Sequence, residues 1–291
     1  MRKTVQRYFG DHALDWADRS YLIDWIVIVL IWMLAWITSL SPVFERTFDL
    51  KDPIIDYPHG KDQISSTLNH NIAFWFPILI LVLVGGIRRS LIEIHHGLIA
   101  LCAGRGLARL VTVLMKHRVG RLRPDFLARC KWDKVLNACT GDPKLILDGR
   151  KSFPSGHSST AFSGMTFLAL WLAGNTAAWC FDQTKPAGSV RSSRLGCLFL
   201  TLLPLSWAAF VAISRMEDYK HHKEDIIVGS VIGIISATIS YLLFWPNPCS
   251  TRSFAPDRER IPRQPYANEE YRIPDVEFRL TRLEEEDIEH I

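Results

Sequence analysis

The sequence predicts an all-α protein, a polytopic bundle of six transmembrane helices. Three observations lead to this prediction: apolar residues make up 48% of the 291 residues, they gather in runs of about twenty, and the charges lie between the runs. A helix of ~20 residues spans the ~30 Å of hydrocarbon in a bilayer. The apolar content excludes a disordered chain. The net charge of +4, without a dominant basic stripe, argues against a nucleic-acid-binding protein.

The six spans follow from these runs. We expect them at residues 21–40, 72–87, 91–115, 159–179, 195–213 and 226–245. The second is the shortest, so its polar flanks at Asn69–Asn71 or Arg88–Arg89 would have to lie near the headgroups. The third contains charged and histidine side chains, so it could instead be an amphipathic helix of a soluble protein. Its apolar residues nevertheless continue for twenty-five positions, which favours a span.

The segments outside the spans are polar. Residues 1–20 mix both charges, and no cleavable signal peptide is expected because the first apolar run is long enough to stay in the membrane. Residues 246–291 are rich in proline and predict a mobile tail. With six spans both termini share one side, and loops 41–71, 116–157 and 214–225 share the other. Each side carries sixteen Lys and Arg, so the positive-inside rule indicates no orientation.

The loops on that other side contain three motifs at the ends of spans. In chain order they are Lys116-x6-Arg123-Pro, Pro154-Ser-Gly-His157 and Ser214-Arg-x5-His221-x3-Asp225. A phosphate dianion repels nucleophiles, so its transfer needs cations around its oxygens, and Lys116, Arg123 and Arg215 supply three. Ser155 and the Gly156 amide precede a predicted helix start, where amides favour an anion. The motifs therefore indicate a phosphate site near the headgroup plane.

Together these motifs resemble those of the type 2 phosphatidic acid phosphatase family, the lipid phosphate phosphatases, which share them with soluble acid phosphatases and vanadium haloperoxidases. The stretches Gly120–Leu127, Leu147–Gly149 and Asp218–His222 look like the fungal diacylglycerol pyrophosphate phosphatase branch. The resemblance implies a helical bundle of this kind that acts on membrane lipid phosphates. It implies hydrolysis of diacylglycerol pyrophosphate to phosphatidate and of phosphatidate to diacylglycerol, with no metal and no other cofactor.

The resemblance also implies a role for each motif residue. His221 would attack phosphorus and form a phosphohistidine, while His157 would protonate the leaving oxygen and then activate water. Asp225, four residues after His221, would orient its imidazole. Phosphate binding would fall to Lys116, Arg123, Ser155, Gly156 and Arg215. His222 is the alternative nucleophile, but the motif spacing favours His221.

Other functions stay open at this point. A polyisoprenyl-diphosphate phosphatase would use the same motifs on a longer lipid. A catalytically silent lipid-binding membrane protein should have lost His157, His221 or Arg215, and all three are present. A transporter should show paired half-helices or an internal repeat, and the sequence has neither. By family analogy the active site faces a lumen or the exterior, in a vacuole-like or other endomembrane.

Arg105 and Arg109 lie on one helical stripe with Lys116 in the third span. One interpretation is that this stripe leads positive charge down beneath the phosphate site. The other, which we favour, is that both arginines pair with Glu or backbone groups inside the bundle.

Two more pairs of residues lie outside the motifs. His95 and His96 match none of them, and we interpret both as structural. Cys130 and Cys139 fall nine residues apart in the basic loop 116–157. A disulfide between them is chemically permitted if the loop is lumenal, and the sequence leaves both states open.

Overall fold

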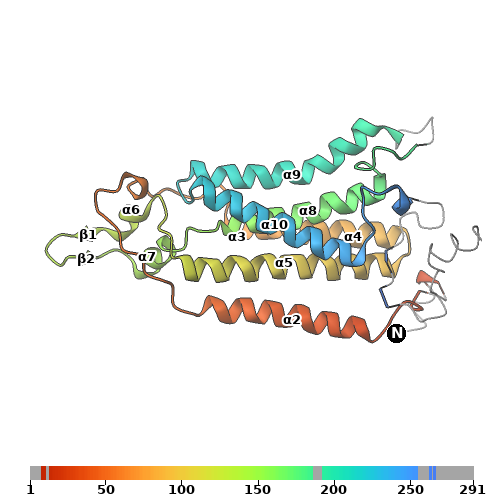
Figure 1. Ribbon diagram of the computed structural model, residues 1–291, viewed down its shortest axis with the longest axis horizontal. Coiled ribbons are helices and arrows are strands. Elements are labelled where there is room, and N and C mark those ends of the chain that lie inside the picture. The colour runs from red at the N-terminus through yellow and green to blue at the C-terminus, as the bar shows by residue number, and fades with distance from the viewer. Residues whose placement is uncertain (1–7, 11–12, 186–191, 255–261, 264, 267–291) are drawn as a thin grey trace, which may run out of the picture.

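The computed structural model describes residues 8–10, 13–185, 192–254, 262–263 and 265–266. Helices run along the long axis of the molecule (Figure 1) and confirm the predicted all-α fold. The long helices are α2 (Ser20–Ser39), α5 (Leu91–Val119), α8 (Gly156–Thr176), α9 (Arg194–Glu217), α10 (Lys223–Phe244) and the composite helix α3–η2–α4 (Ser66–His70, Asn71–Trp75 and Phe76–Ile87). In the described part of the chain the strands are β1 (Trp132–Asp133) and β2 (Ala138–Cys139), an antiparallel pair.

The central helix is α8, which packs against α5, α9 and α10. Its first half is rich in Ser, Gly and Ala, and most of its residues are buried. Small residues let neighbouring helices approach closely inside a membrane bundle. Five helices of the described chain are long and apolar enough to cross a bilayer, and α8 is not among them. The predicted six spans therefore correspond to five apolar helices and one that faces protein rather than lipid.

The second predicted span, 72–87, is too short. The helix begins at Ser66, where the Ser65 hydroxyl accepts a hydrogen bond from the Leu68 amide, and it continues to Ile87 for 22 residues. The sequence left either Asn69–Asn71 or Arg88–Arg89 to lie near the headgroups, but Asn69 is buried and its side chain donates to the His157 carbonyl (3.0 Å). Asn69 therefore faces the interior of the bundle, whereas Asn71 is exposed.

Helix α2 lies at the edge of the bundle and packs on α5 (Figure 1). Most of its large apolar side chains are exposed, as expected for a lipid-facing helix. The Tyr21 hydroxyl lies 3.0 Å from His96 Nε2, and Trp25 Nε1 donates to His95 Nε2 (3.1 Å). Both histidines thus join α2 to α5, in agreement with the structural role predicted for them.

Loops 40–65, 120–155 and 218–222 gather at one end of the bundle, the loop end, and the described terminal segments lie at the other (Figure 1). The loop end contains η1 (Pro53–Ile55), α6 (Phe126–Cys130) and α7 (Pro143–Gly149) around a small apolar cluster. Cys130 and Cys139 form a disulfide, with 4.7 Å between their Cα atoms. The pairing that the sequence left open is therefore present, and it ties α6 to β2.

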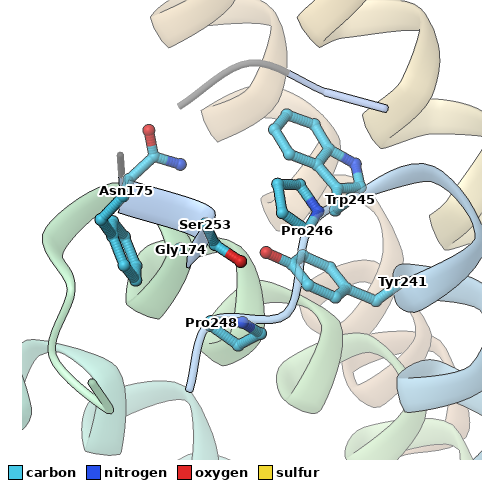
Figure 2. Close-up of a pocket in the computed structure, with 8 residues that line it drawn as sticks. Gly174, Asn175, Tyr241, Trp245, Pro246, Pro248 and Ser253 are labelled. Atoms are coloured by element: carbon cyan, nitrogen blue, oxygen red, sulfur yellow. The ribbon is translucent and has the colours of Figure 1, made fainter. Parts of the chain in front are cut away.

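The described part of the tail, for which the sequence predicts mobility, contacts the bundle, and its mobility stays a prediction. Residues 246–254 fold back against the ends of α8 and α10, where Figure 2 shows Trp245, Pro246 and Pro248 beside Tyr241. They leave a cavity of only about 10 Å³. The Tyr266 hydroxyl donates to the Asp24 carboxylate at the start of α2 (2.9 and 3.0 Å). In the described part of the tail, Phe254 is buried and Tyr266 has partners on α2, which local composition does not reveal. Residues 255–261, 264 and 267–291 of the predicted tail lie outside the described residues.

Candidate active site

The three motifs converge at the loop end of the bundle around two adjoining cavities. The inner cavity, of about 400 Å³, extends between the helices, and the outer one, of about 470 Å³, lies under the loops. Ser66, Arg123 and His157 line both. Lys116 and His221 line the inner cavity, together with Gly156; Arg215 lines the outer one. The predicted site therefore lies where a cavity within the bundle meets a cavity under the loops.

Backbone contacts hold the motifs together. Helix α5 ends at Gly120, which has a positive φ of 57°, and a Cβ there would collide with the Phe44 carbonyl. The Ser155 amide donates to the Asp225 carbonyl (2.8 Å), which joins the second motif to the third. A Cβ on Gly229 would lie 2.5 Å from the Ser155 carbonyl oxygen, so only glycine lets α10 pass this close.

His221 lies in the turn between α9 and α10 and is buried. Its Nδ1 is 3.7 Å from Asp225 Oδ2 and 3.5 Å from Ser152 Oγ. That leaves Nε2 as the nitrogen available to a ligand in the inner cavity. Burial, together with the positive charge of Arg123, holds the pKa of His221 well below its usual range, although Asp225 acts in the opposite direction. The imidazole is therefore neutral at neutral pH and carries a free lone pair.

Asp225 is fully buried and has more partners than the sequence suggested. It accepts hydrogen bonds from Arg121 Nη1 (2.9 Å) and the Ser152 hydroxyl. Asp225 Oδ2 also accepts a hydrogen bond from the His222 amide (3.0 Å), and His222 Nδ1 lies 3.3 Å from the same oxygen. His222 is thus closer to Asp225 than His221 is, but it caps α10 and lines neither cavity. The position in the cavity favours His221 as the reactive residue.

The three predicted cations are each held by protein groups. Arg123 donates to the Asp148 carbonyl (2.9 Å), to its carboxylate (3.0 Å) and to the Lys220 carbonyl (3.2 Å). Lys116 Nζ donates to the Lys151 carbonyl (2.6 Å). Arg215, only 1% exposed, pairs with Asp218 (2.8 Å) and Asp62 (3.2 Å). These contacts fix the positions of the three cationic side chains.

The second motif begins α8. The buried Ser155 hydroxyl accepts the Ser158 amide (3.3 Å) and caps the helix. Its predicted contact with phosphate stays a prediction, because Gly156 and His157, but not Ser155, line the inner cavity. His157 Nε2 lies 3.4 Å from the Ser66 hydroxyl. The positive end of α8 therefore points at the junction of the two cavities.

A segment before the second span closes over the outer cavity. Lys220 Nζ donates to the Gly60 carbonyl (2.7 Å), and His59 Nδ1 lies 2.6 Å from Asp125. Burial opposes ionisation of Asp125, but hydrogen bonds from Arg129 and His59 outweigh it and lower its pKa. Asp125 therefore stays ionised and anchors this segment.

Sequence reasoning missed several residues of the site. They are Asp62, Ser66, Asn69, Arg121 and Ser152. Arg121 lies within the stretch Gly120–Leu127, so that stretch offered a signal for it. The others come from loops or from the helix start that the sequence placed at the headgroups.

The stripe on α5 satisfies both interpretations in part. Arg105 donates to the Thr160 carbonyl (2.9 Å), which is the backbone pairing we favoured. Arg105, Arg109 and Lys116 also line the inner cavity together. Positive charge therefore does continue from the predicted phosphate site into the bundle.

Comparison with known proteins identifies the family. The family model of the PAP2 superfamily matches residues 97–249, just over half of the chain, and this region contains all three motifs. The chain belongs to the PAP2 superfamily. This assignment confirms the family that the motifs indicated.

Full-length relatives of this PAP2 protein share about a third of its residues. "Lipid phosphate phosphatase 2" of Arabidopsis thaliana is 32% identical over 82% of this chain and 82% of the relative. "Probable diacylglycerol pyrophosphate phosphatase 1" of Schizosaccharomyces pombe is 35% identical over 70% and 73%, respectively. "Diacylglycerol pyrophosphate phosphatase 1" of Saccharomyces cerevisiae is 30% identical over 88% and 90%. No solved structure matches this PAP2 chain.

Proposed function

We propose that this protein is an integral-membrane lipid phosphatase that hydrolyses diacylglycerol pyrophosphate to phosphatidate and phosphatidate to diacylglycerol. The observation that carries the proposal is the position of His157 and His221 on one cavity that continues between membrane-spanning helices. A lipid phosphate could bind there with its acyl chains still in the bilayer. The names of the plant and fungal relatives support the same class of substrate.

The geometry supports a two-step reaction. In the first step His221 Nε2 attacks phosphorus, the bond to the leaving oxygen breaks, and His157 gives that oxygen a proton. In the second step His157 takes a proton from water, whose oxygen attacks the phosphohistidine and returns His221 to its free form. Asp225 holds Nδ1 of His221 throughout. Lys116, Arg123 and Arg215, with the Gly156 amide, stabilise the equatorial oxygens of phosphorus.

The proposal is tested by phosphate release from purified protein in mixed micelles. We expect phosphate release from both diacylglycerol pyrophosphate and phosphatidate. A liposome assay compares both lipids with a third substrate, a polyisoprenyl diphosphate. Release from the polyisoprenyl lipid alone would assign the alternative phosphatase. No release from any of the three lipids would indicate a silent lipid-binding protein and overturn the proposal.

We predict that activity does not depend on an added metal ion. Three cationic side chains occupy the role that Mg²⁺ has in other phosphoryl-transfer enzymes. Phosphate release from phosphatidate in excess EDTA should therefore change by less than about twofold. An absolute requirement for added Mg²⁺ would contradict this mechanism.

We predict that His221 stays neutral at mildly acidic pH. Its pKa in the folded protein is lowered, so protonation occurs below the usual His value of about 6.5. Diethyl pyrocarbonate reacts with an imidazole only when that imidazole is neutral. Its rate of reaction at His221, followed by fragment mass spectrometry in a His222→Asn background, should have its midpoint below pH 6.5. A midpoint at or above pH 6.5 would show that burial does not lower the pKa of His221.

We propose that α8 crosses the bilayer as the sixth span and that the loop end of the bundle faces a lumen or the exterior, in a vacuole-like or other endomembrane. The disulfide Cys130–Cys139 supports this orientation, because disulfides persist in oxidising compartments. The protein is taken from native membranes and treated with a maleimide-linked polymer under denaturing conditions. A reduced sample should carry two more labels than an unreduced one. The Cys130→Ser variant should show no such gain. Equal labelling of the unaltered protein with and without reductant would contradict the orientation.

A further inference from the structure

The inner cavity carries more positive charge than a single phosphate requires. Beyond Lys116 and Arg123 it is lined by Arg105 and Arg109, and no Asp or Glu is among its described lining residues. Unpaired charge within a membrane bundle is costly and marks a functional site. We propose that Arg105 binds the phosphate that does not react in a lipid diphosphate. This inference rests on the proposed function and deepens it, because it makes the site selective for diphosphates over monophosphates.

Arg105 has an incomplete set of partners. It is 5% exposed, and its Nη1 donates to the Thr160 carbonyl (2.9 Å) and the Ser163 hydroxyl (3.1 Å). Its Nη2 lies 3.3 Å from His70 Nδ1, and its Nε is buried without any hydrogen-bond partner. No ion pair joins Arg105 to a carboxylate anywhere in the described chain. A guanidinium has five donors and is always charged, so this one still lacks an anion.

The position of Arg105 suits the second phosphate of a diphosphate. Its guanidinium contacts Thr160, which is four residues, or ~6 Å along α8, from the Gly156 amide at the predicted phosphate site. The two phosphorus atoms of a diphosphate share one oxygen, so the non-reacting phosphate lies directly beside the reacting one. With its terminal phosphate at His221, a lipid diphosphate directed into the cavity would place its second phosphate toward Arg105.

Two neighbours complete this proposed subsite. His70, on the composite helix α3–η2–α4, offers its imidazole beside Arg105. Arg109, one turn along α5, lies with its guanidinium carbon 5.9 Å from the centre of the Trp32 ring on α2, and both residues line the same cavity. Arg109 has no ion pair in the described chain either, so it can add a second positive charge near the bound phosphate.

The experiment compares two lipids with identical acyl chains, diacylglycerol pyrophosphate and phosphatidate. In Arg105→Gln we expect kcat/KM to fall by about tenfold or more for the diphosphate and by less than about twofold for phosphatidate. The matched control is Arg118→Gln on the exposed surface of the same helix, for which neither value should change. An equal fall for both lipids, or no fall, would overturn the inference and indicate a structural role for Arg105.

A second variant and a second readout keep the test independent of folding and of the lipid. Within the described part of the chain, Arg109→Gln removes the contact with the Trp32 ring but no hydrogen bond to another helix. It should also lower kcat/KM more for the diphosphate than for phosphatidate. Inorganic pyrophosphate should inhibit the unaltered protein more strongly than inorganic phosphate does, and Arg105→Gln should abolish that difference. If the unaltered protein hydrolysed neither lipid, the proposed function would be wrong. Equal inhibition by pyrophosphate and phosphate would contradict the proposed subsite but not the proposed function.

Discussion

Replacing His221 with alanine should lower phosphate release from phosphatidate by roughly 10³-fold or more, because no other described residue on the inner cavity is placed to attack phosphorus with the support of Asp225. The same variant should form no acid-labile phosphoenzyme. Rapid quenching with lipid labelled in its terminal phosphate measures both effects.

His222→Ala is the matched control for this prediction. His222 neighbours His221 and contacts the same carboxylate, but it lines neither cavity. We expect its loss to reduce activity by less than about tenfold, through weaker capping of α10. Label recovered on His222 of the unaltered protein, or a normal rate in His221→Ala, would reassign the nucleophile.

Replacing His157 with alanine should have an effect that depends on the leaving group. General acid catalysis contributes about 10²–10⁴-fold, and it matters most for a leaving oxygen of high pKa. Phosphatidate releases an alkoxide, whereas diacylglycerol pyrophosphate releases a phosphate oxygen that needs little protonation. Phosphoenzyme formation should therefore fall by about 10²-fold or more with phosphatidate and by much less with the diphosphate.

The second step provides a control for the role of His157. Because it should also activate water, phosphoenzyme formed from the diphosphate should persist in His157→Ala and accumulate as a burst. The single-turnover rate with each lipid and the lifetime of the phosphoenzyme are the measurements. Equal slowing of phosphoenzyme formation with both lipids would show that His157 does not act as the acid.

The sequence determined the family, the helical class and the candidate residues on which the proposed chemistry rests. Long apolar runs can satisfy their backbone groups in a membrane only as helices, so the order of the long helices follows from the pattern of apolar residues. The three motifs have fixed spacing at the ends of those helices, which is why Lys116, Arg123, His157 and His221 could be named before any coordinates and were then found on one cavity.

Tertiary structure alone decided which groups share an environment. The partnership of Asp225 with Arg121 joins residues 104 positions apart, and Asn69 reaches the His157 carbonyl across 88 positions. Local sequence predicted the polar start of the second span as headgroup contact, because hydropathy cannot distinguish water from a polar interior. The unpaired Nε of Arg105 is visible only when neighbouring helices are in place, since whether a charge is satisfied depends on what packs around it.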